Sequence, residues 1–323
     1  MFEGFLDDNE IDVVQAHNLH LDFFELSRAL ETACRARGVP VYLVMHNDAF
    51  IDRSEETTHR IVREIDWAKL VPISETIRQS MMARLPGIHE DKWQVIIHGI
   101  DIETFSPAAE EKKEALRASY GLKDRRVILH PGRFLPWKGI LPAIKSMPRV
   151  IEDVPNALMV MTGRAQRIYK DRDELAMYDA KIDRTIWERG PRDHVHIGTY
   201  THEDIPRLTA LSEVMIYTTI GKEPSGWVPV EGMACGAPVV TDSGGLTESV
   251  VDGKTGFVIS KDEEKGPQEL ARRLIQVLSD EALAERLGEQ GRRRAEDLFD
   301  KGPMATDFIQ LSESLVDQSG PVP

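Results

Sequence analysis

The sequence predicts an α/β fold with parallel sheets, because short apolar runs alternate with amphipathic stretches along most of the chain. The apolar runs are nearly continuous, which is typical of strands that are covered on both faces of a sheet. The chain has 323 residues, more than one ordinary hydrophobic core needs. We therefore expect two domains of the α/β class.

The N-terminal part alternates strand-like and helix-like segments up to a charged connection. The predicted strands cover residues 11–16, 41–46, 69–73 and 93–99, and the predicted helices cover 21–36 and 74–85. Residues 100–126 then hold a proline, a charged helix and the start of a new strand. We place the domain boundary inside this connection, so that residues 1–107 form a partial N-terminal domain that is Rossmann-like.

The same alternation resumes in a longer C-terminal domain, residues 108–300. Its predicted strands cover residues 127–132, 157–163, 214–219 and 237–242, and its predicted helices start near 138 and cover 229–235, 265–279 and 281–297. Residues 301–323 are expected to form a helix followed by a frayed tail, and this helix is expected to cross back to the N-terminal domain.

Composition and charge exclude several classes of protein. Hydrophobic residues make up 41% and charged residues 29% of the chain, as in soluble globular proteins. The formal net charge of −14 argues against a general nucleic-acid binder, which needs a basic face. Two cysteines, Cys34 and Cys235, cannot build a disulfide framework. No long apolar stretch and no signal-peptide pattern is seen, so we expect a cytoplasmic protein.

The segment HPGRFLPWKG, residues 130–139, follows a predicted strand and opens a helix. Such a loop places backbone N–H groups, including that of Gly132, at the carboxyl edge of the sheet, where α/β folds bind ligands. Arg133 and Lys138 would add two positive charges suited to phosphate oxygens. The spacing is not that of a Walker A loop. The alternative is a surface loop with two solvated cations.

The segment EPSGWVPVEGMACGAPVV, residues 223–240, predicts a second ligand-binding loop. Pro229 suits the first turn of a helix, which would place Glu231 in that turn as well. Residues 225–228 would form the entering loop, and Gly226 would let a ligand approach the backbone. With Glu223 just before it, two carboxylates flank a set of amide donors. This set suits a polyhydroxylated ligand that carries phosphates, whereas the alternative is two glutamates that cap the helix or face water.

Two further sets of residues follow predicted strands. Gly244 and Gly245, after the strand at 237–242, would form another loop of free amides, or a plain turn. His17, His20 and His46 stand at the ends of two strands in the N-terminal part, where imidazoles can hydrogen-bond a sugar or satisfy a turn. No spacing indicates a metal site, and the DRD triplet at 171–173 is expected to be solvated surface.

Taken together, these segments resemble the retaining glycosyltransferases of the GT-B fold, glycosyltransferase family four, over residues 11–300. The most specific part is 223–259, which is similar to the E-x7-E signature of that family. Residues 130–139 resemble its Gly-Arg…Lys-Gly diphosphate loop, and 196–217 resemble the unit before the signature. Residues 95–107 resemble its hinge segment, although His98 replaces the usual Asn.

The resemblance implies roles for the residues that match the motifs. Arg133 and Lys138 would bind the donor diphosphate, Glu231 the ribose hydroxyls, and Glu223 the transferred sugar in an oxocarbenium-like transition state. The backbone amides that would line the pocket belong to Gly226, Trp227 and Val228. His20 or His17 matches the histidine that contacts the donor sugar in relatives, with His46 as a third candidate.

The implied reaction moves a hexosyl unit from a UDP- or GDP-sugar to a hydroxyl acceptor, with retention and without a metal or cofactor. A cleft between two domains would hold the donor, and closure would accompany turnover. The acceptor, whether glycan, lipid-linked sugar or small molecule, is not readable.

The front of the chain departs from the family, because the DVVxxH-like segment already starts at Asp12. A truncated N-terminal domain leaves three readings: a short enzyme, a chain completed by a partner or a second copy, or a truncated gene product. The alternatives to an active transferase are a nucleotide-sugar-binding subunit that needs a partner chain and, less favoured by the signature, a GT-B-fold sugar-nucleotide epimerase.

Overall fold

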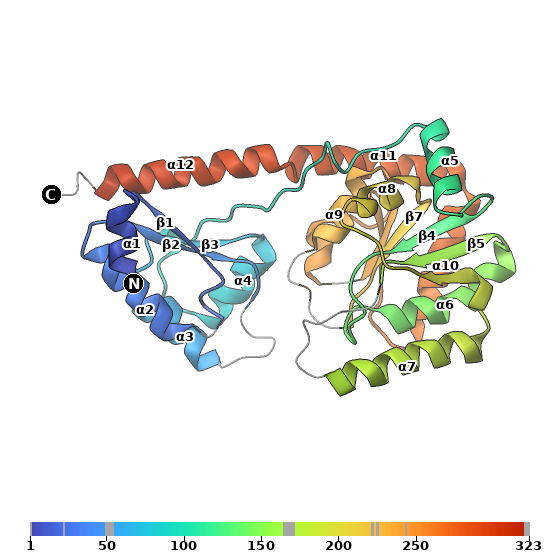
Figure 1. Cartoon of the computed structure of the whole chain (residues 1–323), viewed down its shortest axis with the longest axis horizontal. Helices are drawn as coiled ribbons and strands as arrows, with labels where there is room; N and C mark the ends of the chain where they lie inside the picture. The colour runs from blue at the N-terminus through green and yellow to red at the C-terminus, as the bar shows by residue number, and fades with distance from the viewer. Residues whose placement is uncertain are drawn as a thin grey trace. The chain divides into compact units, whose positions relative to one another are not determined.

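The computed structural model of the chain describes residues 2–21, 23–48, 55–163, 172–220, 223, 226–242 and 244–319. The chain forms two compact units, Met1–Gly99 with Lys301–Pro323 and Ile100–Asp300, whose elements are labelled in Figure 1. The first division falls at Gly99, N-terminal to the boundary predicted at 107. Both units have parallel sheets, which confirms the predicted α/β class.

The first unit has a parallel sheet with strand order β1-β2-β3. Its elements are α1 (Phe2–Asp8), β1 (Val14–His17), α2 (Phe24–Arg35), β2 (Val41–Met45), α3 (Glu55–Glu64), β3 (Leu70–Pro72), α4 (Glu75–Arg84), η1 (Glu90–Lys92) and α12 (Lys301–Ser319). Every residue of β2 is buried, as its apolar sequence predicts. Leu311 and Leu315 of α12 complete the core of this unit.

The prediction of a strand at 93–99 is wrong, although this segment runs beside β3. Gln94 N donates to Leu70 O at 3.0 Å and Ile96 N donates to Pro72 O at 3.2 Å, and the one bridge in this stretch pairs Leu70 with Trp93. A parallel ladder would also require residue 72 to donate its N–H to the carbonyl of Gln94. Proline has no N–H, so the ladder is incomplete at this position.

The second unit has a parallel sheet with strand order β6-β5-β4-β7-β8-β9. Its helices are α5 (Glu110–Ser119), α6 (Ile140–Asp153), α7 (Arg172–Arg189), η2 (Arg192–His194), α8 (Asp204–Leu211), α9 (Trp227–Ala234), η3 (Gly245–Glu248), α10 (Lys265–Ser279) and α11 (Glu281–Leu298). Its strands are β4 (Arg126–His130), β5 (Ala157–Met161), β6 (Val195–Ile197), β7 (Val214–Tyr217), β8 (Val239–Asp242) and β9 (Gly256–Ile259). The strand order reverses between β4 and β7.

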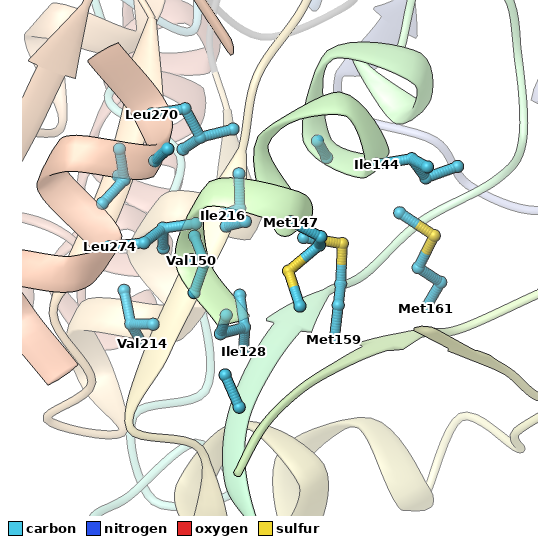
Figure 2. Packing of buried hydrophobic residues seen from close by; sticks show 14 of the residues in the cluster. Ile128, Ile144, Met147, Val150, Met159, Met161, Val214, Ile216, Leu270 and Leu274 are labelled. Carbon is cyan, nitrogen blue, oxygen red and sulfur yellow. The ribbon is translucent and has the colours of Figure 1, made fainter. Parts of the chain in front are cut away.

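Alternate residues of these strands fill two separate hydrophobic layers. On one face, Ile128 of β4 and Met159 of β5 pack with α6, α7 and α10, where Figure 2 shows Ile144, Met147 and Val150 of α6 directed at the strands. On the other face, Leu129 of β4 packs in the layer that includes residues of α8 and α9. The continuous apolar strands of the sequence are therefore explained by a sheet that is covered on both faces.

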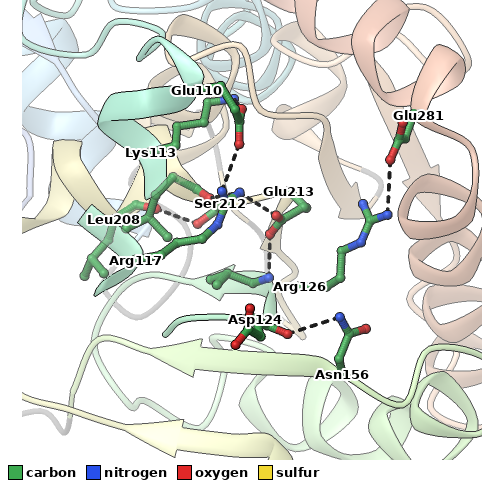
Figure 3. Close-up of polar contacts among 12 residues, drawn as sticks. Glu110, Lys113, Arg117, Asp124, Arg126, Asn156, Leu208, Ser212, Glu213 and Glu281 are labelled. Atoms are coloured by element: carbon green, nitrogen blue, oxygen red, sulfur yellow. Dashed lines mark hydrogen bonds and ion pairs between the residues drawn. The ribbon is translucent and has the colours of Figure 1, made fainter. Parts of the chain in front are cut away.

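A polar network holds α5 against the amino ends of β4 and β7 (Figure 3). Arg117 donates to Glu213 at 2.6 Å and to the carbonyl of Leu211 at 3.2 Å. The other oxygen of Glu213 accepts from the backbone N–H of Val127. Both charged side chains are mostly buried. Through these bonds the carboxylate of Glu213 links α5 to β4, the first strand of the unit.

We predict that Gly288→Ala destabilises the second unit. A Cβ at Gly288 of α11 would lie 2.2 Å from the carbonyl oxygen of Gly236, so helix and turn would have to separate. Overpacking of this kind costs about 1–3 kcal/mol, more than the helix gains from alanine. Gly4→Ala in α1, where the added Cβ meets nothing within 4 Å, is the control and should not lower the melting temperature. Equal melting temperatures for the two variants would contradict the prediction.

Candidate functional site

The reversal of strand order places two loops side by side at the carboxyl edge of the second sheet, the position where open α/β sheets bind ligands. The loop after β4 covers residues 131–139, and its amide at Gly132 donates to Thr162 Oγ1 at 2.9 Å. The backbone at Gly132 has φ 111°, which requires glycine. At the end of this loop a Cβ on Gly139 would lie 2.2 Å from Thr218 Oγ1, so glycine is what lets the two loops touch.

Lys138 and Glu223 meet across these loops. The ammonium of Lys138 lies 2.8 Å from Glu223 Oε2, and both side chains are mostly buried. Lys138 also donates to the hydroxyl of Tyr217, the last residue of β7, at 2.5 Å. The structure thus joins two residues that the sequence singled out and adds a tyrosine that it did not.

Burial, and then the negative charge of Glu223, raises the pKa of Tyr217 well above its ordinary value, so its hydroxyl stays protonated. Arg133 is exposed, and its charge acts on Tyr217 in the opposite sense, which places the guanidinium near this group. Tyr217 was missed because a tyrosine at the end of an apolar strand looks like core. The one signal that could have found it is its position, at the carboxyl end of the strand before the signature.

Glu231 lies on α9, but not in its first turn as predicted. The helix begins at Trp227, two residues earlier than expected, with Gly226 as its N-cap. Glu231 is therefore in the second turn, partly buried, and the helix has no acidic residue in its first turn. Burial raises the pKa of Glu231 from 4.5 to about 7.

Three of the predicted glycine and loop positions have structural explanations. A Cβ on Gly226 would lie 2.4 Å from Leu246 Cδ2, so packing against η3 already requires glycine there. The amide of Gly245 donates to the carbonyl of Glu223 at 3.1 Å and is not free, contrary to the prediction. Gly244 has φ 114° and forms the turn. Trp227 is half-exposed and Val228 is partly buried in the first turn of α9, whereas Ser225 lies outside the described residues.

A second network that the sequence did not reveal lies at the ends of β7 and β8. Asp242 accepts from the N–H of Thr219, and its Oδ1 lies 3.6 Å from the ammonium of Lys261. Burial raises the pKa of Asp242 to about 6, although Thr219 and Lys261 favour its ionised form. A cavity of about 120 Å³ adjoins these residues on the side of α6 and α10. None of Arg133, Lys138, Glu223 and Glu231 lines it.

In the first unit, His17 and His46 are in direct contact, and His20 is apart from them. His17 Nδ1 lies 2.7 Å from His46 Nε2. His17 is the last residue of β1 and is exposed. His20 is fully buried, its Nε2 lies 3.0 Å from the carbonyl oxygen of Asn47, and burial lowers its pKa to about 4. His98 packs on His46 with ring centroids 4.6 Å apart.

Within the part of the chain that the structure describes, no group of three or more His, Cys, Asp or Glu side chains is arranged to hold a metal ion. Two residues of the DRD triplet, Asp171 and the side chain of Arg172, lie outside that part. Among the described helices, none combines the length and apolar character that a membrane crossing requires.

Parallel sheets with charged side chains at a switch point define an α/β protein of the class that binds ligands at the carboxyl edge of its sheet. The family described as Glycosyl transferases group 1 matches residues 112–294. Spore coat protein SA of Bacillus subtilis (strain 168) is 30% identical over 278 residues, which cover 84% of this chain and 71% of that protein. The chain therefore belongs to the Glycosyl transferases group 1 family.

Solved structures with lower sequence identity show the same fold. HepE from Anabaena, crystallised in complex with UDP, matches with a TM-score of 0.83 at 21% identity, over 97% of this chain and 82% of HepE. Sucrose-phosphate synthase from Thermosynechococcus elongatus matches with a TM-score of 0.79 at 22% identity, over 98% of this chain and 77% of that chain. These likenesses confirm the predicted fold class, α/β of the GT-B type.

We predict that the pH dependence of stability reports on Glu231. Its folded pKa of about 7 lies above 4.5, so the native state binds the proton more tightly. The stability that this carboxyl contributes is complete below pH 4.5 and is lost as the pH rises through 7. The stability of Glu231→Gln relative to the wild type should therefore rise by up to about 2 kcal/mol between pH 5.5 and 8.

Melting temperatures of the two proteins at pH 5.5 and pH 8 check this prediction. Glu289→Gln, on the exposed face of α11, is the matched control, and its difference from the wild type should be the same at both pH values. A Glu231→Gln difference that does not change with pH would show that this carboxyl is ionised throughout.

Proposed function

We propose that the chain is a retaining glycosyltransferase that moves a hexosyl unit from a UDP- or GDP-sugar to a hydroxyl acceptor. The observation that carries this proposal is the Lys138–Glu223 pair, 2.8 Å long, at the switch point of the second sheet. It combines a cation for a diphosphate with a carboxylate for a sugar. HepE, with the same fold, has been crystallised with UDP and with UDP-glucose, which supports a nucleotide-sugar donor.

In this proposal the donor diphosphate binds to Arg133, Lys138 and the first turn of α9. Lys138 has three N–H donors, and its contacts with Tyr217 and Glu223 account for two of them, so one can reach a phosphate oxygen. Arg133 is exposed and offers a planar fork to the same group. Trp227 and Val228 form the N-terminal end of α9, where the positive end of the helix dipole favours an anion, and this gives them a place in the same site.

Breaking the bond between the anomeric carbon and the diphosphate oxygen leaves negative charge on the diphosphate. Fixed cations and amides that already point at this charge stabilise it without reorganisation. No metal is needed in this scheme, because Arg133 and Lys138 supply the positive charge. The acceptor hydroxyl attacks on the face that the nucleotide leaves and passes its proton to the departing diphosphate oxygen, which retains the configuration.

The two glutamates have different environments, which suits the different roles that we assign to them. Glu223 is paired with Lys138 and lies next to the diphosphate cations, where its charge can face an oxocarbenium-like sugar. No described residue forms such an ion pair with Glu231, and its carboxyl oxygens can accept hydrogen bonds from ribose hydroxyls. In the first unit, we assign the sugar contact to His17, because its residue is exposed whereas His20 is buried.

We predict that Lys138→Met and Glu223→Gln abolish sugar transfer without unfolding the chain. Loss of a preorganised charge at the reacting group typically costs about 10²–10³ in kcat. The measurement is release of UDP or GDP from a panel of nucleotide sugars with and without acceptor mixtures, together with the melting temperature. Lys254→Met and Glu289→Gln change the same residue types on the exposed surface and should keep wild-type rates.

The same assay separates the alternatives. Wild-type rates in both site variants would overturn the proposal. Stabilisation by UDP or GDP without any transfer would instead indicate a binding subunit that needs a partner chain. Conversion of the donor alone to an epimer would indicate an epimerase.

A further inference from the structure

We propose that His17, His46 and His98 act as one unit, in which His46 and His98 are positioning residues that fix the ring orientation and the tautomer of His17. The sugar contact of His17 rests on the proposed function, but its positioning by the other two rings does not. Their contacts lie entirely within the first unit of the structure.

The three rings come from three segments that end at one edge of the first sheet. His17 is the last residue of β1, and His46 follows β2 directly. His98 follows the extended segment beside β3, where its N–H points at the carbonyl of Ile73 at 3.4 Å. Parallel strands end at the same edge, so the topology itself gathers these side chains.

The 2.7 Å contact between His17 Nδ1 and His46 Nε2 requires one proton between two nitrogens. If both carried protons the donors would face each other, and if neither did the lone pairs would repel. Whichever nitrogen holds the proton, the partner fixes the tautomer of His17 and therefore what its Nε2 does. Nε2 accepts a hydrogen bond in one arrangement and donates one in the other.

His46 is held on two further sides. Its backbone N–H donates to Asn18 Oδ1 at 2.9 Å, which ties the end of β2 to the residue after His17. His98 meets its ring in a nearly perpendicular arrangement, at 79° between the planes. His98 in turn lies 6.2 Å from the ring of Phe308 on α12, also nearly edge to face. The ring of His46 therefore has little freedom to turn away from His17.

The surroundings favour neutral rings. Partial burial lowers the pKa of His17 and of His46, and burial lowers that of His98 to about 4. The charge of a protonated His17 also opposes protonation of His46 and His98. The nearby carboxylate of Asp48 accepts from Ser80 Oγ at 2.7 Å, and its charge acts on His20. From α12 come Phe308 and Met304, which carry no charge. A single proton can lie between the facing nitrogens as long as at least one of His17 and His46 is neutral.

His98 is also where this chain departs from the hinge segment that it resembles, which has Asn at this position. An asparagine has no ring to cover His46.

The experiment uses the full chain with ¹⁵N-labelled histidine. Ring ¹⁵N shifts report the tautomer of each imidazole, and a titration reports its pKa; the signals of His17 are assigned by their loss in His17→Gln. In the wild type, His17 should show a single neutral tautomer at pH 7. His46→Phe should turn it into a mixture of tautomers, and His98→Ala should raise the pKa of His17 and His46 toward 6.5, because water reaches the rings.

His98→Phe is the matched control, since it keeps a ring over His46 without a titratable group, and it should preserve the tautomer of His17. Where the wild type transfers sugar, His46→Phe should lower kcat at pH 8 by roughly 10- to 100-fold, as for a misplaced reacting group, and leave KM for the donor within about twofold. His46→Gln is the second variant if His46→Phe lowers the melting temperature.

A mixed tautomer of His17 in the wild type, or an unchanged one in His46→Phe and His46→Gln, would overturn the inference. So would an active enzyme whose kcat does not respond to these variants. Absence of transfer by the wild type with every donor would refute the proposed function instead, and the NMR spectra would still decide whether the three rings act together.

Discussion

The ion pair between Lys138 and Glu223 is the contact on which the carboxyl edge of the second sheet depends. The loop after β4 leads to α6 on one face of the sheet, and the loop after β7 leads to α9 on the other. The reversal of strand order therefore sends the two loops to opposite faces, and the ion pair joins them at 2.8 Å. Two charges that are mostly withdrawn from water need further hydrogen bonds to offset the cost of losing their hydration. The hydroxyl of Tyr217 provides the additional hydrogen bond.

The glycines of the two loops allow the close packing that brings Lys138 and Glu223 together. Gly139 lies against Thr218, and Gly226 lies against Leu246, each closer than a Cβ would permit. Gly245 uses its amide to hold the carbonyl of Glu223. The glycines of these loops are therefore required by contacts within the protein itself. These contacts fix the conformation of the loops without any ligand.

Much of this arrangement could be predicted from the sequence, and the failures have physical causes. Arg133, Lys138, Glu223 and Glu231 could be named because charged residues next to glycine at strand ends are local patterns, and the structure brings Lys138 and Glu223 into contact. The start of α9 was placed two residues late, since Pro229 was taken as its first position although a proline fits anywhere in the first turn. The segment at 93–99 has the composition of a strand, but its pairing depends on the missing N–H of Pro72 on another strand.

Other contacts between distant segments could not be predicted. Tyr217 and Asp242 end apolar strands and look like core, and their hydrogen-bond partners follow only from the strand order. The same holds for His98, which comes more than fifty residues after His46 and meets it only because β2 and β3 are neighbours. Sequence reasoning named His17, His20 and His46 together, whereas burial separates His20 from the other two.

A chain with a net charge of −14 must still attract a diphosphate if it is to act on a nucleotide sugar. At the edge of the second sheet, Glu223 offsets the charge of Lys138 and Asp242 offsets that of Lys261. Glu231, with a pKa of about 7, carries only part of a negative charge near neutral pH. Arg133 and the N-terminus of α9 then leave a positive balance at the switch point. Burial of one carboxyl therefore removes a negative charge from this edge of the sheet, and it does so at and below the pH at which Glu231 titrates.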